Sequence, residues 1–486
     1  RLDAPVPRYS AKLAVEFKSQ ADRQIRIIGT ITAEAIPASN DPAIRVTAWL
    51  DGERGAARET HASPGAEPSR GIASETFEVD LNAADLPPGR HYVTVRFESV
   101  AEQVHIESEV ADGPTPLANE QAVTFELADP AGRYAAVSYQ GGAGVKTRLI
   151  EVDRDNGAPL LIFGDTAGVV TALDASTMQP RWQYATASEI LHALTRVGPH
   201  IVAGDTDGNL HVLDARTGAQ LHKLSDFAPV FGAGLVVDGA LYFGDANGWL
   251  HAVDTTTWAK IWSRDVAQFA FESPPVHDSQ NDRLLLGSWD GFYYSVSRAA
   301  GEVQWKAWNT QGQVAAKSRY YGPADSAPVV VGDEMWGADR GYRLGRYRLI
   351  DGEFLGEVHS QVAAIAPVGG PTDAAGEGVV ARGQDNRLIR FRPDGSIAWE
   401  TEAPLGRCPI PPTVAAPPAG RRGNIAAVSD RGLLTLVDAE SGEPQLQWSL
   451  TPQLFVLAPV TASSDGKAWF AAGMDGVVTR ISAVND

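Results

Sequence analysis

Residues that could form covalent cross-links or thiolate metal sites are nearly absent from this sequence of 486 residues. Its single cysteine, Cys408, excludes an internal disulfide bond and any metal site built from several thiolates. The sequence also lacks an apolar run of about 18 residues, the length at which a membrane-spanning helix becomes a candidate. We therefore expect a fold held together by apolar packing, with no transmembrane segment.

Positive charge is in deficit. The chain carries 41 Lys and Arg residues against 60 Asp and Glu residues, which gives a formal net charge of −19 at pH 7. A general nucleic-acid binder needs a basic face that displaces the counterions of the phosphate backbone. This balance argues against nucleic acid as a partner, and we expect none.

Motifs of catalysis and metal binding are missing as well. The sequence contains no His-Glu-x-x-His helix, no P-loop and no Gly-x-Ser-x-Gly elbow. The segment Asp205–Asn209 resembles a calcium loop, but it lacks the downstream glutamate and falls where other repeats have a hairpin turn. We therefore predict a turn there, and no catalytic residue, metal or cofactor. The protein is expected not to be an enzyme.

What the sequence does contain is a repeat with a period of about forty residues. Each clear copy has a short apolar run that ends in Asp or Ser and is followed by a glycine. The four clearest runs are Leu160–Asp165, Ile201–Asp205, Leu241–Asp245 and Leu284–Ser288, with glycines at Gly168, Gly208, Gly248 and Gly291. Weaker copies carry Gly341, Gly383, Gly432 and Gly476. Eight copies are visible, and the lack of a sustained helical period favours short strands joined by turns.

Each copy of the repeat is expected to form four strands, which together make one propeller blade. The apolar run and the segment after the glycine form a hairpin. A segment with a tryptophan, such as Trp182 or Trp262, forms the next strand, and a proline-containing segment such as Ser273–Val276 precedes the hairpin. Proline is tolerated there because an innermost strand pairs on one side only. The last copy lacks its outer strand, which we expect Tyr134–Ser138 to supply, so that the ring closes.

The predicted fold class is all-β: an eight-bladed β-propeller over residues 129–486, preceded by a small β-sandwich domain over residues 1–128. The N-terminal part has strand-like segments, among them Ile44–Trp49 and Tyr92–Phe97, without the repeat. About seven such strands are typical of an immunoglobulin-like β-sandwich.

A second motif lies in the turn after each hairpin. It consists of an aspartate, small or hydroxyl residues and then a tryptophan, as in Asp174 to Trp182, Asp254 to Trp262 and Asp438 to Trp448. In this motif the chain resembles the propellers of the PQQ-like repeat family, from Gly132 to Asp486. The resemblance implies that these residues hold neighbouring blades together.

The resemblance also concerns cofactors and partners. Quinoprotein dehydrogenases of the wider family carry PQQ, a calcium ion and an adjacent pair of cysteines, whereas Cys408 stands between Arg407 and Pro409. A quinone site is therefore not expected. In repeat type the chain is similar to the propeller subunit of the bacterial outer-membrane barrel assembly machinery.

Irregularities in the repeat indicate where a ligand would bind, because loops at the channel mouth form the ligand surface of a propeller. The longest insertion runs from Asn309 to Asp325. Arginine forks suit carboxylate, sulfate or phosphate oxygens, and tyrosine rings can stack on sugars. The candidate ligand-binding residues are Lys317, Arg319, Tyr320, Tyr321 and Arg343. In the alternative interpretation these and further arginines up to Arg392 are scattered solvated charges, and Phe269, Phe271 and Phe455 face the core.

Two classes of function remain open. The first, which we predict, is a non-catalytic binding or scaffold protein whose propeller face binds a protein or an anionic glycan. We expect it to be extracytoplasmic, either periplasmic or secreted, and the start at Arg1 agrees with a removed signal peptide. The second is a secreted enzyme or enzyme accessory region. It would be a polysaccharide lyase with Tyr320 or Tyr321 as the base beside Arg319, or the tail of a phosphoesterase.

Overall fold

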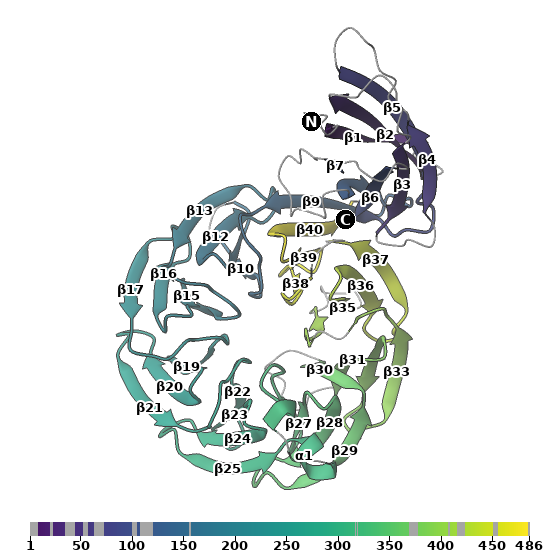
Figure 1. Cartoon of the computed structure of the whole chain (residues 1–486). Helices are drawn as coiled ribbons and strands as arrows, with labels where there is room; N and C mark the ends of the chain where they lie inside the picture. Colours follow the sequence, from purple (N-terminus) through teal and green to yellow (C-terminus); the bar gives the residue numbers. More distant parts are fainter. Residues whose placement is uncertain are drawn as a thin grey trace, which may run out of the picture. The chain divides into compact units, whose positions relative to one another are not determined.

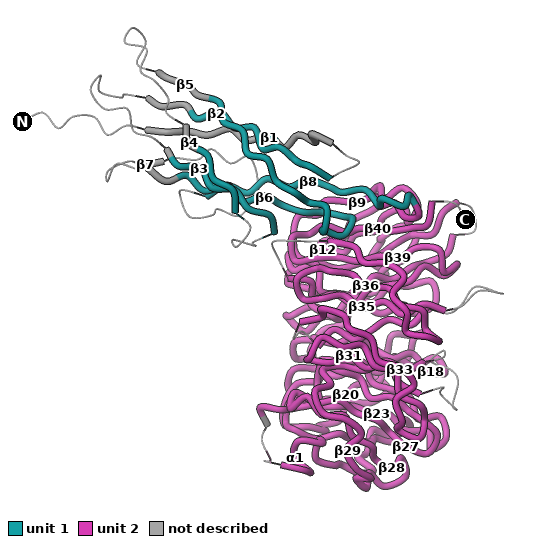
Figure 2. The backbone as a smooth tube through the Cα atoms, turned by 90° about the vertical axis from the view of Figure 1, so that its right-hand side faces the viewer, with its two compact units in different colours: residues 1–132 teal, residues 133–486 magenta. Residues whose placement is uncertain are grey.

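The computed structural model (Figure 1) describes residues 8–19, 23–34, 44–51, 57–62, 72–99, 105–106, 120–154, 157–315, 317, 319–368, 378–406, 409–415, 423–450 and 455–484. The chain divides into two compact units, Arg1–Gly132 and Arg133–Asp486 (Figure 2). Among the described residues, helix is confined to α1 (Thr310–Val314) and the 3-10 helix η2 (Arg319–Tyr321). The prediction of an all-β fold is confirmed.

Unit 1 contains two β-sheets that share one apolar core. One sheet has the order β5-β2-β1-β7, and in the other β8 pairs with β6, β6 with β3 and β3 with β4. The strands are β1 (Arg8–Ser19), β2 (Gln24–Glu34), β3 (Ile44–Leu50), β4 (Arg58–Ala62), β5 (Ile72–Asn82), β6 (Gly89–Ser99), β7 (His105–Ile106) and β8 (Glu120–Leu127). Alternate residues face the core, for example Ile25 and Ile27 on β2 and Val93 and Val95 on β6. The immunoglobulin-like topology stays a prediction.

In unit 2, four-stranded antiparallel sheets surround a central opening (Figure 1). The first three are β10 (Ile150–Val152), β11 (Leu160–Gly164), β12 (Val169–Asp174), β13 (Pro180–Ala185); β14 (Leu194–Val197), β15 (His200–Gly204), β16 (Leu210–Asp214), β17 (Gln220–Leu224); and β18 (Leu235–Val237), β19 (Ala240–Gly244), β20 (Trp249–Asp254), β21 (Lys260–Asp265). The next three are β22 (Val276–Asp278), β23 (Arg283–Gly287), β24 (Phe292–Ser297), β25 (Val303–Trp308); β26 (Val329–Val331), β27 (Glu334–Ala338), β28 (Arg343–Arg348), β29 (Phe354–Ser360); and β30 (Val362–Pro367), β31 (Val379–Gly383), β32 (Arg387–Phe391), β33 (Ile397–Glu402). The last combines β38 (Thr461–Ala462), β39 (Ala468–Ala472), β40 (Val477–Ala483) and β9 (Tyr134–Gln140).

The prediction of an eight-bladed propeller is wrong, because the described part of unit 2 forms seven separate four-stranded sheets. The strands β34 (Thr413–Val414), β35 (Asn424–Val428), β36 (Leu433–Asp438) and β37 (Pro444–Ser449) repeat the blade order but do not form a four-stranded sheet of their own. The expected number came from recurring turns, and a turn defines a hairpin but not where a sheet ends. The outermost strand of a blade has one row of backbone N–H and C=O groups that can pair with a further strand. Whether a sheet ends at four strands therefore depends on that edge.

Ring closure takes place as predicted. β9, from the start of unit 2, is the outer strand of the sheet that contains the C-terminal strand β40. The two strands pair antiparallel from Val477 opposite Gln140 to Ala483 opposite Tyr134. The two ends of the unit are therefore joined in one sheet, which removes a free edge.

Apolar clusters lie between neighbouring blades. In one cluster Leu160 and Ile162 of β11 pack with Ile201 and Ala203 of β15. The second strand of a blade is covered on both faces, and every residue of β11, β19 and β39 is buried. This explains the unbroken apolar runs of the repeat, since a strand buried on both faces has no reason to alternate.

The repeat tryptophans dock each blade on the next one. Trp182 Nε1 donates to the carbonyl oxygen of Ala215 at 3.2 Å, and the indole covers Gly218 in the same turn of the next blade. Equivalent bonds join Trp262 to Arg298, Trp305 to Leu349 and Trp399 to Ala439. Their structural role is thereby explained.

At one blade interface the large aromatic ring and its partner occupy exchanged positions. At the turn position of Gly218, the next blade carries Trp258, whose φ is 58°. At the strand position of Trp182, the preceding β17 carries His222. The rings of His222 and Trp258 lie 5.9 Å apart, so the turn supplies the large aromatic ring that the strand lacks.

Candidate functional site

One face of unit 2 carries the insertion that the sequence predicted as the ligand-binding region. Because the four strands of a blade are antiparallel, the turn between the second and third strands lies on the same face as the connection from the outer strand to the next blade. We call this face the loop face. It contains the Asp/Gly turns such as Asp205–Gly208 and the insertion that follows β25.

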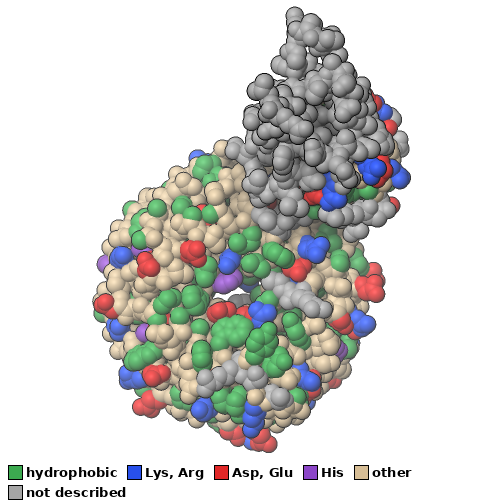
Figure 3. Space-filling view, in the orientation of Figure 1, with side chains coloured by type: hydrophobic (Ala, Val, Ile, Leu, Met, Phe, Trp, Pro, Cys, Tyr) green, Lys and Arg blue, Asp and Glu red, His purple; other side chains and the backbone are tan. Residues whose placement is uncertain are grey.

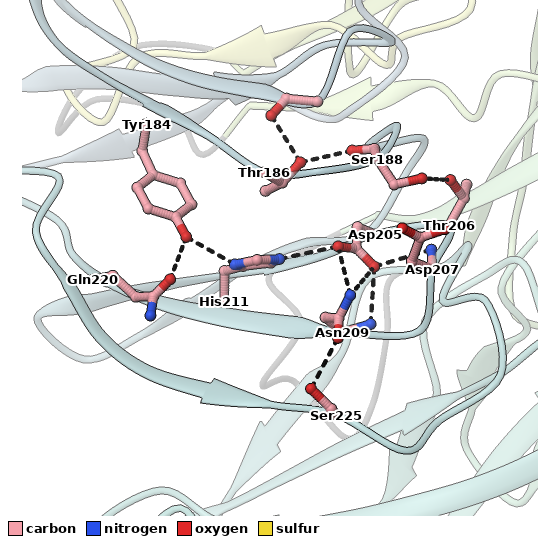
Figure 4. Close-up of polar contacts among 11 residues, drawn as sticks. Tyr184, Thr186, Ser188, Asp205, Thr206, Asp207, Asn209, His211, Gln220 and Ser225 are labelled. Carbon is pink, nitrogen blue, oxygen red and sulfur yellow. Dashed lines mark hydrogen bonds and ion pairs between the residues drawn. The ribbon is translucent and has the colours of Figure 1, made fainter.

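The turn at Asp205 is held by a complete set of hydrogen bonds (Figure 4). Asp205 Oδ1 accepts from the backbone N–H groups of Asp207 at 3.0 Å and Asn209 at 2.8 Å, and Oδ2 is 3.0 Å from Nε2 of the buried His211. Burial raises the pKa of Asp205, but these hydrogen bonds lower it by more, so that the net shift is downward. The predicted turn is confirmed.

In two blades the histidine of this turn also contacts a residue of a type that occurs in catalytic sites. His211 Nδ1 lies 2.9 Å from the hydroxyl of Tyr184 (Figure 4). In the following blade His251 contacts Asp245 at 3.0 Å and Ser263 at 2.8 Å, which is the composition of a nucleophilic triad. Since the same His–Asp contact supports the turn in both blades whatever the third residue is, we interpret it as structural. Among the described residues, no group of three or more His, Cys, Asp or Glu side chains could hold a metal ion.

The insertion after β25 is anchored by two polar side chains. Asn309 caps α1 by accepting from the backbone N–H of Gly312 at 2.9 Å, and it donates to the carbonyl oxygen of Tyr321. The buried Asp339 accepts from the backbone N–H of Gln311 at 2.7 Å. These contacts tie both α1 and η2 to the blades beneath them.

The predicted ligand-binding residues are distributed over this insertion and its neighbour. Lys317 Nζ lies 5.6 Å from the ring centroid of Trp308. Tyr320 is 80% exposed, and its ring stands edge-on to that of Tyr321 at 5.3 Å. Arg319 begins η2, but its side chain lies outside the described part. The structure thus brings the two tyrosines together beside the anchored helix.

Arg343 has two polar partners within the fold. Its Nε donates to Gln311 Oε1 at 2.8 Å, and its Nη1 donates to Glu357 Oε1 at 2.8 Å. The other arginines of this region also contact a carboxylate or a backbone carbonyl: Arg340 with Asp325, Arg346 with Glu334, Arg348 with Asp351, Arg387 with Glu400, Arg382 with Val428, Arg390 with Ala439 and Arg392 with Ile397. Most of the positive charge seen in the sequence is therefore neutralised locally.

A buried ion pair lies at the end of the insertion. Burial raises the pKa of Asp325 to about 6, although the adjacent Arg340 lowers it. The Arg340 guanidinium is also 5.6 Å from the ring centroid of Trp289. Sequence reasoning missed this pair, since nothing in the repeat relates an insertion residue to a turn of the following blade.

Exposed aromatic residues were also missed. Phe271 is buried as expected, but Phe269 is 45% exposed and Phe455 is 59% exposed, so the expectation of core-facing rings is wrong for these two. Both belong to connections between blades, as does Tyr320. The loop face is seen in Figure 3, where hydrophobic side chains gather beside the central opening.

Comparison with known proteins identifies the repeat. A family model of the PQQ type, described as outer membrane protein assembly factor BamB, matches residues 140–268 and residues 207–361. The repeats of residues 140–361 are therefore of the PQQ-like family. The sequence prediction of this family is confirmed.

Solved structures share the fold of this PQQ-like propeller. BamB from Moraxella catarrhalis is 17% identical with a TM-score of 0.54, and the match covers 71% of this chain and 100% of that one. The computationally designed protein Ika8 is 15% identical with a TM-score of 0.55, and the match covers 71% of this chain and 98% of that one. No curated protein matches the chain. None of the helices in the described residues has the length and apolar character that crossing a lipid bilayer requires.

Proposed function

We propose that the protein is a non-catalytic, extracytoplasmic scaffold whose loop face binds another protein. The observation that carries this proposal is the exposure of aromatic side chains on that face. Phe269, Tyr320 and Phe455 are 45%, 80% and 59% exposed, and each comes from a different connection between blades.

Exposed aromatic groups on a common face are a feature of interaction surfaces. A single exposed apolar residue is ordinary, but aromatic residues are enriched where proteins bind one another. A chain with a net charge of −19 has ample polar residues with which to cover a surface that needs only solubility. Three exposed rings from separate connections together indicate an interaction surface, which no single one of them would.

The charges of the insertion support a protein partner over an anionic glycan. An anionic sugar would require guanidinium groups that are available for bidentate contacts. Arg340 and Arg343 are instead paired with Asp325 and Glu357. Aromatic contacts are then the main means of recognition that the described side chains offer.

The family supports both the location and the kind of partner. The matching family is named for an outer membrane protein assembly factor, and a member of that name shares the fold. We infer from this an extracytoplasmic location and a partner that is itself a protein.

The test compares two triple variants. Phe269→Ser/Tyr320→Ser/Phe455→Ser removes the exposed rings of the loop face. Leu221→Ser/Ile261→Ser/Ile397→Ser removes residues of similar exposure, 46%, 52% and 43%, from the outer strands. Partners captured from a cell-envelope extract by the wild type are purified, and their dissociation constants are measured for all three proteins. The loop-face variant should bind at least about tenfold more weakly, as expected for the loss of interface anchors.

Equal affinity of both variants for every captured protein would contradict the proposed surface. The non-catalytic part is tested separately, by incubating the wild type with uronate-containing polysaccharides and recording the absorbance of the unsaturated product. Product formation above a protein-free control would favour the lyase alternative.

A further inference from the structure

An exposed arginine lies beside the innermost strand of the first blade. Arg148 precedes β10, the innermost strand of its blade, and its side chain is exposed. Its neighbours Thr147 and Leu149 are 0% and 1% exposed, and the Thr147 hydroxyl bonds to Gly164 of β11. Arg148 is therefore an exposed residue between two buried ones, directly before the innermost strand of its blade.

This guanidinium has no partner within the described part of the chain. Among the described residues, no hydrogen bond and no ion pair involves the Arg148 side chain. Although the side chain is accessible to solvent, the surrounding protein partly desolvates it and so lowers the pKa of Arg148, and no carboxylate of the described residues offsets this effect. A charge that is partly desolvated and unpaired is unfavourable unless an opposite charge reaches it.

The contrast with neighbouring arginines is informative. Arg196, on the inner strand of the next blade, donates to the backbone carbonyls of Glu151 at 3.1 Å and Gly198 at 3.4 Å. Arg382 lies fully buried and donates to the carbonyl oxygen of Val428 at 2.6 Å. Both cations are thus satisfied by the fold itself, whereas Arg148 is left available in a chain with 60 acidic residues.

A second cation and a histidine lie close to Arg148. Lys146 lies two positions before Arg148, and like Arg148 it is more exposed than the residues on either side of it. His192 Nδ1 lies 3.0 Å from the carbonyl oxygen of Lys146. The pKa of His192 is lowered mainly by burial, and the positive charge of Lys146 lowers it further. Figure 3 shows Lys or Arg and His side chains at the edge of the central opening.

We propose that Arg148, with Lys146 and His192 beside it, forms an anion site in the channel that takes a phosphate or carboxylate group. The planar guanidinium binds either group through paired hydrogen bonds, and Lys146 adds a second positive charge. The site is separate from the aromatic rings of the loop face, so it stands whether or not those rings bind a protein.

Calorimetric titration tests the site with three probes: inorganic phosphate, triglycine with a free carboxylate and triglycine amide. The proteins are the wild type, Arg148→Gln and the matched control Arg196→Gln. Arg148→Gln should weaken binding at least about tenfold, as expected for the loss of a charge-assisted contact. Arg196→Gln should bind as the wild type does. Because Arg148 makes no contact that supports the fold, its variant should keep the melting temperature of the wild type.

The probes also identify the source of the anion. Binding of phosphate alone assigns a phosphate ligand, and binding of triglycine but not of its amide assigns a carboxylate. The proposal is overturned if the wild type binds neither anion, if triglycine amide binds equally well, or if Arg148→Gln binds as tightly as the wild type.

Discussion

The indole of Trp262 in one blade lies against Gly301 in the turn of the next blade. A Cβ atom added at Gly301 would lie 2.8 Å from Trp262 Cε3, and the glycine has a φ of +72°. The same turn accepts a hydrogen bond from Trp262 Nε1 at the carbonyl oxygen of Arg298. Neighbouring blades are therefore joined through a contact that requires the absence of a side chain.

Gly301→Ala should destabilise unit 2 more than a glycine substitution that introduces backbone strain alone. Positive φ costs about 1 kcal/mol for alanine, and overpacking against the indole adds about 1–3 kcal/mol. Gly332→Ala is the control, because Gly332 has a φ of +59° and nothing within 4 Å of an added Cβ. The free energy of unfolding by urea measures both, and equal losses would contradict the packing argument.

The exchanged interface predicts a rescue. Trp258 is 7% exposed, and Trp258→Gly should cost about 3–5 kcal/mol because it leaves a cavity beside His222. Adding His222→Trp recreates the arrangement of Trp182 and Gly218 and should recover most of that loss. A double-mutant cycle measures the coupling. Additive losses would show that the two positions do not substitute for each other.

The His–Asp contacts predict a structural effect. His251→Phe should destabilise the protein by about 1–3 kcal/mol, because Asp245 then loses a buried donor. Ser263→Ala should cost less, since Ser263 contacts only the other ring nitrogen. Thermal unfolding of both variants checks this order. A larger loss for Ser263→Ala would contradict the interpretation of His251 as a support for the turn.

Asp339 predicts a pH dependence of stability. Burial raises its pKa to about 6 from 3.8, although backbone hydrogen bonds from Gln311, Arg343 and Gly341 lower it. Because the pKa is higher in the folded state, the favourable contribution of this group is complete below pH 3.8 and is lost as the pH rises through 6.

The unfolding free energy of the wild type, relative to that of Asp339→Asn, should thus fall by about 2–3 kcal/mol between about pH 3.5 and about pH 7. Urea denaturation of both proteins over this range measures the difference. A constant difference would show that the carboxyl group does not titrate as its burial implies.

The blade motif was predictable because each of its parts is determined locally. The glycine at Gly208 follows from the positive φ of a tight turn, and the apolar run before it follows from burial on both faces. Closure was predictable because the last repeat lacked a strand and Tyr134–Ser138 was the strand without a repeat. Each inference needed only neighbouring residues or a missing copy.

The rest depends on contacts that the repeat does not define. Arg343 meets Glu357 across a strand pair whose register shifts between Leu344 and Gly345, so sequence spacing alone cannot pair them. Phe269 and Phe271 are two positions apart in an irregular connection, and one is exposed while the other is buried. The number of separate blades depends on the outer edges of the sheets, which carry no motif.

Closure of the ring also places a constraint on synthesis. The hydroxyl oxygens of Ser138 in β9 and Thr479 in β40 lie 3.0 Å apart, yet the two residues are 341 positions apart in the chain. During translation β9 emerges long before its partner and must wait as an unpaired edge, which is a state that invites aggregation. Completion of the propeller is consequently a late event with a large loop-closure cost, and folding is slow in the manner of proteins that depend on distant strand pairing.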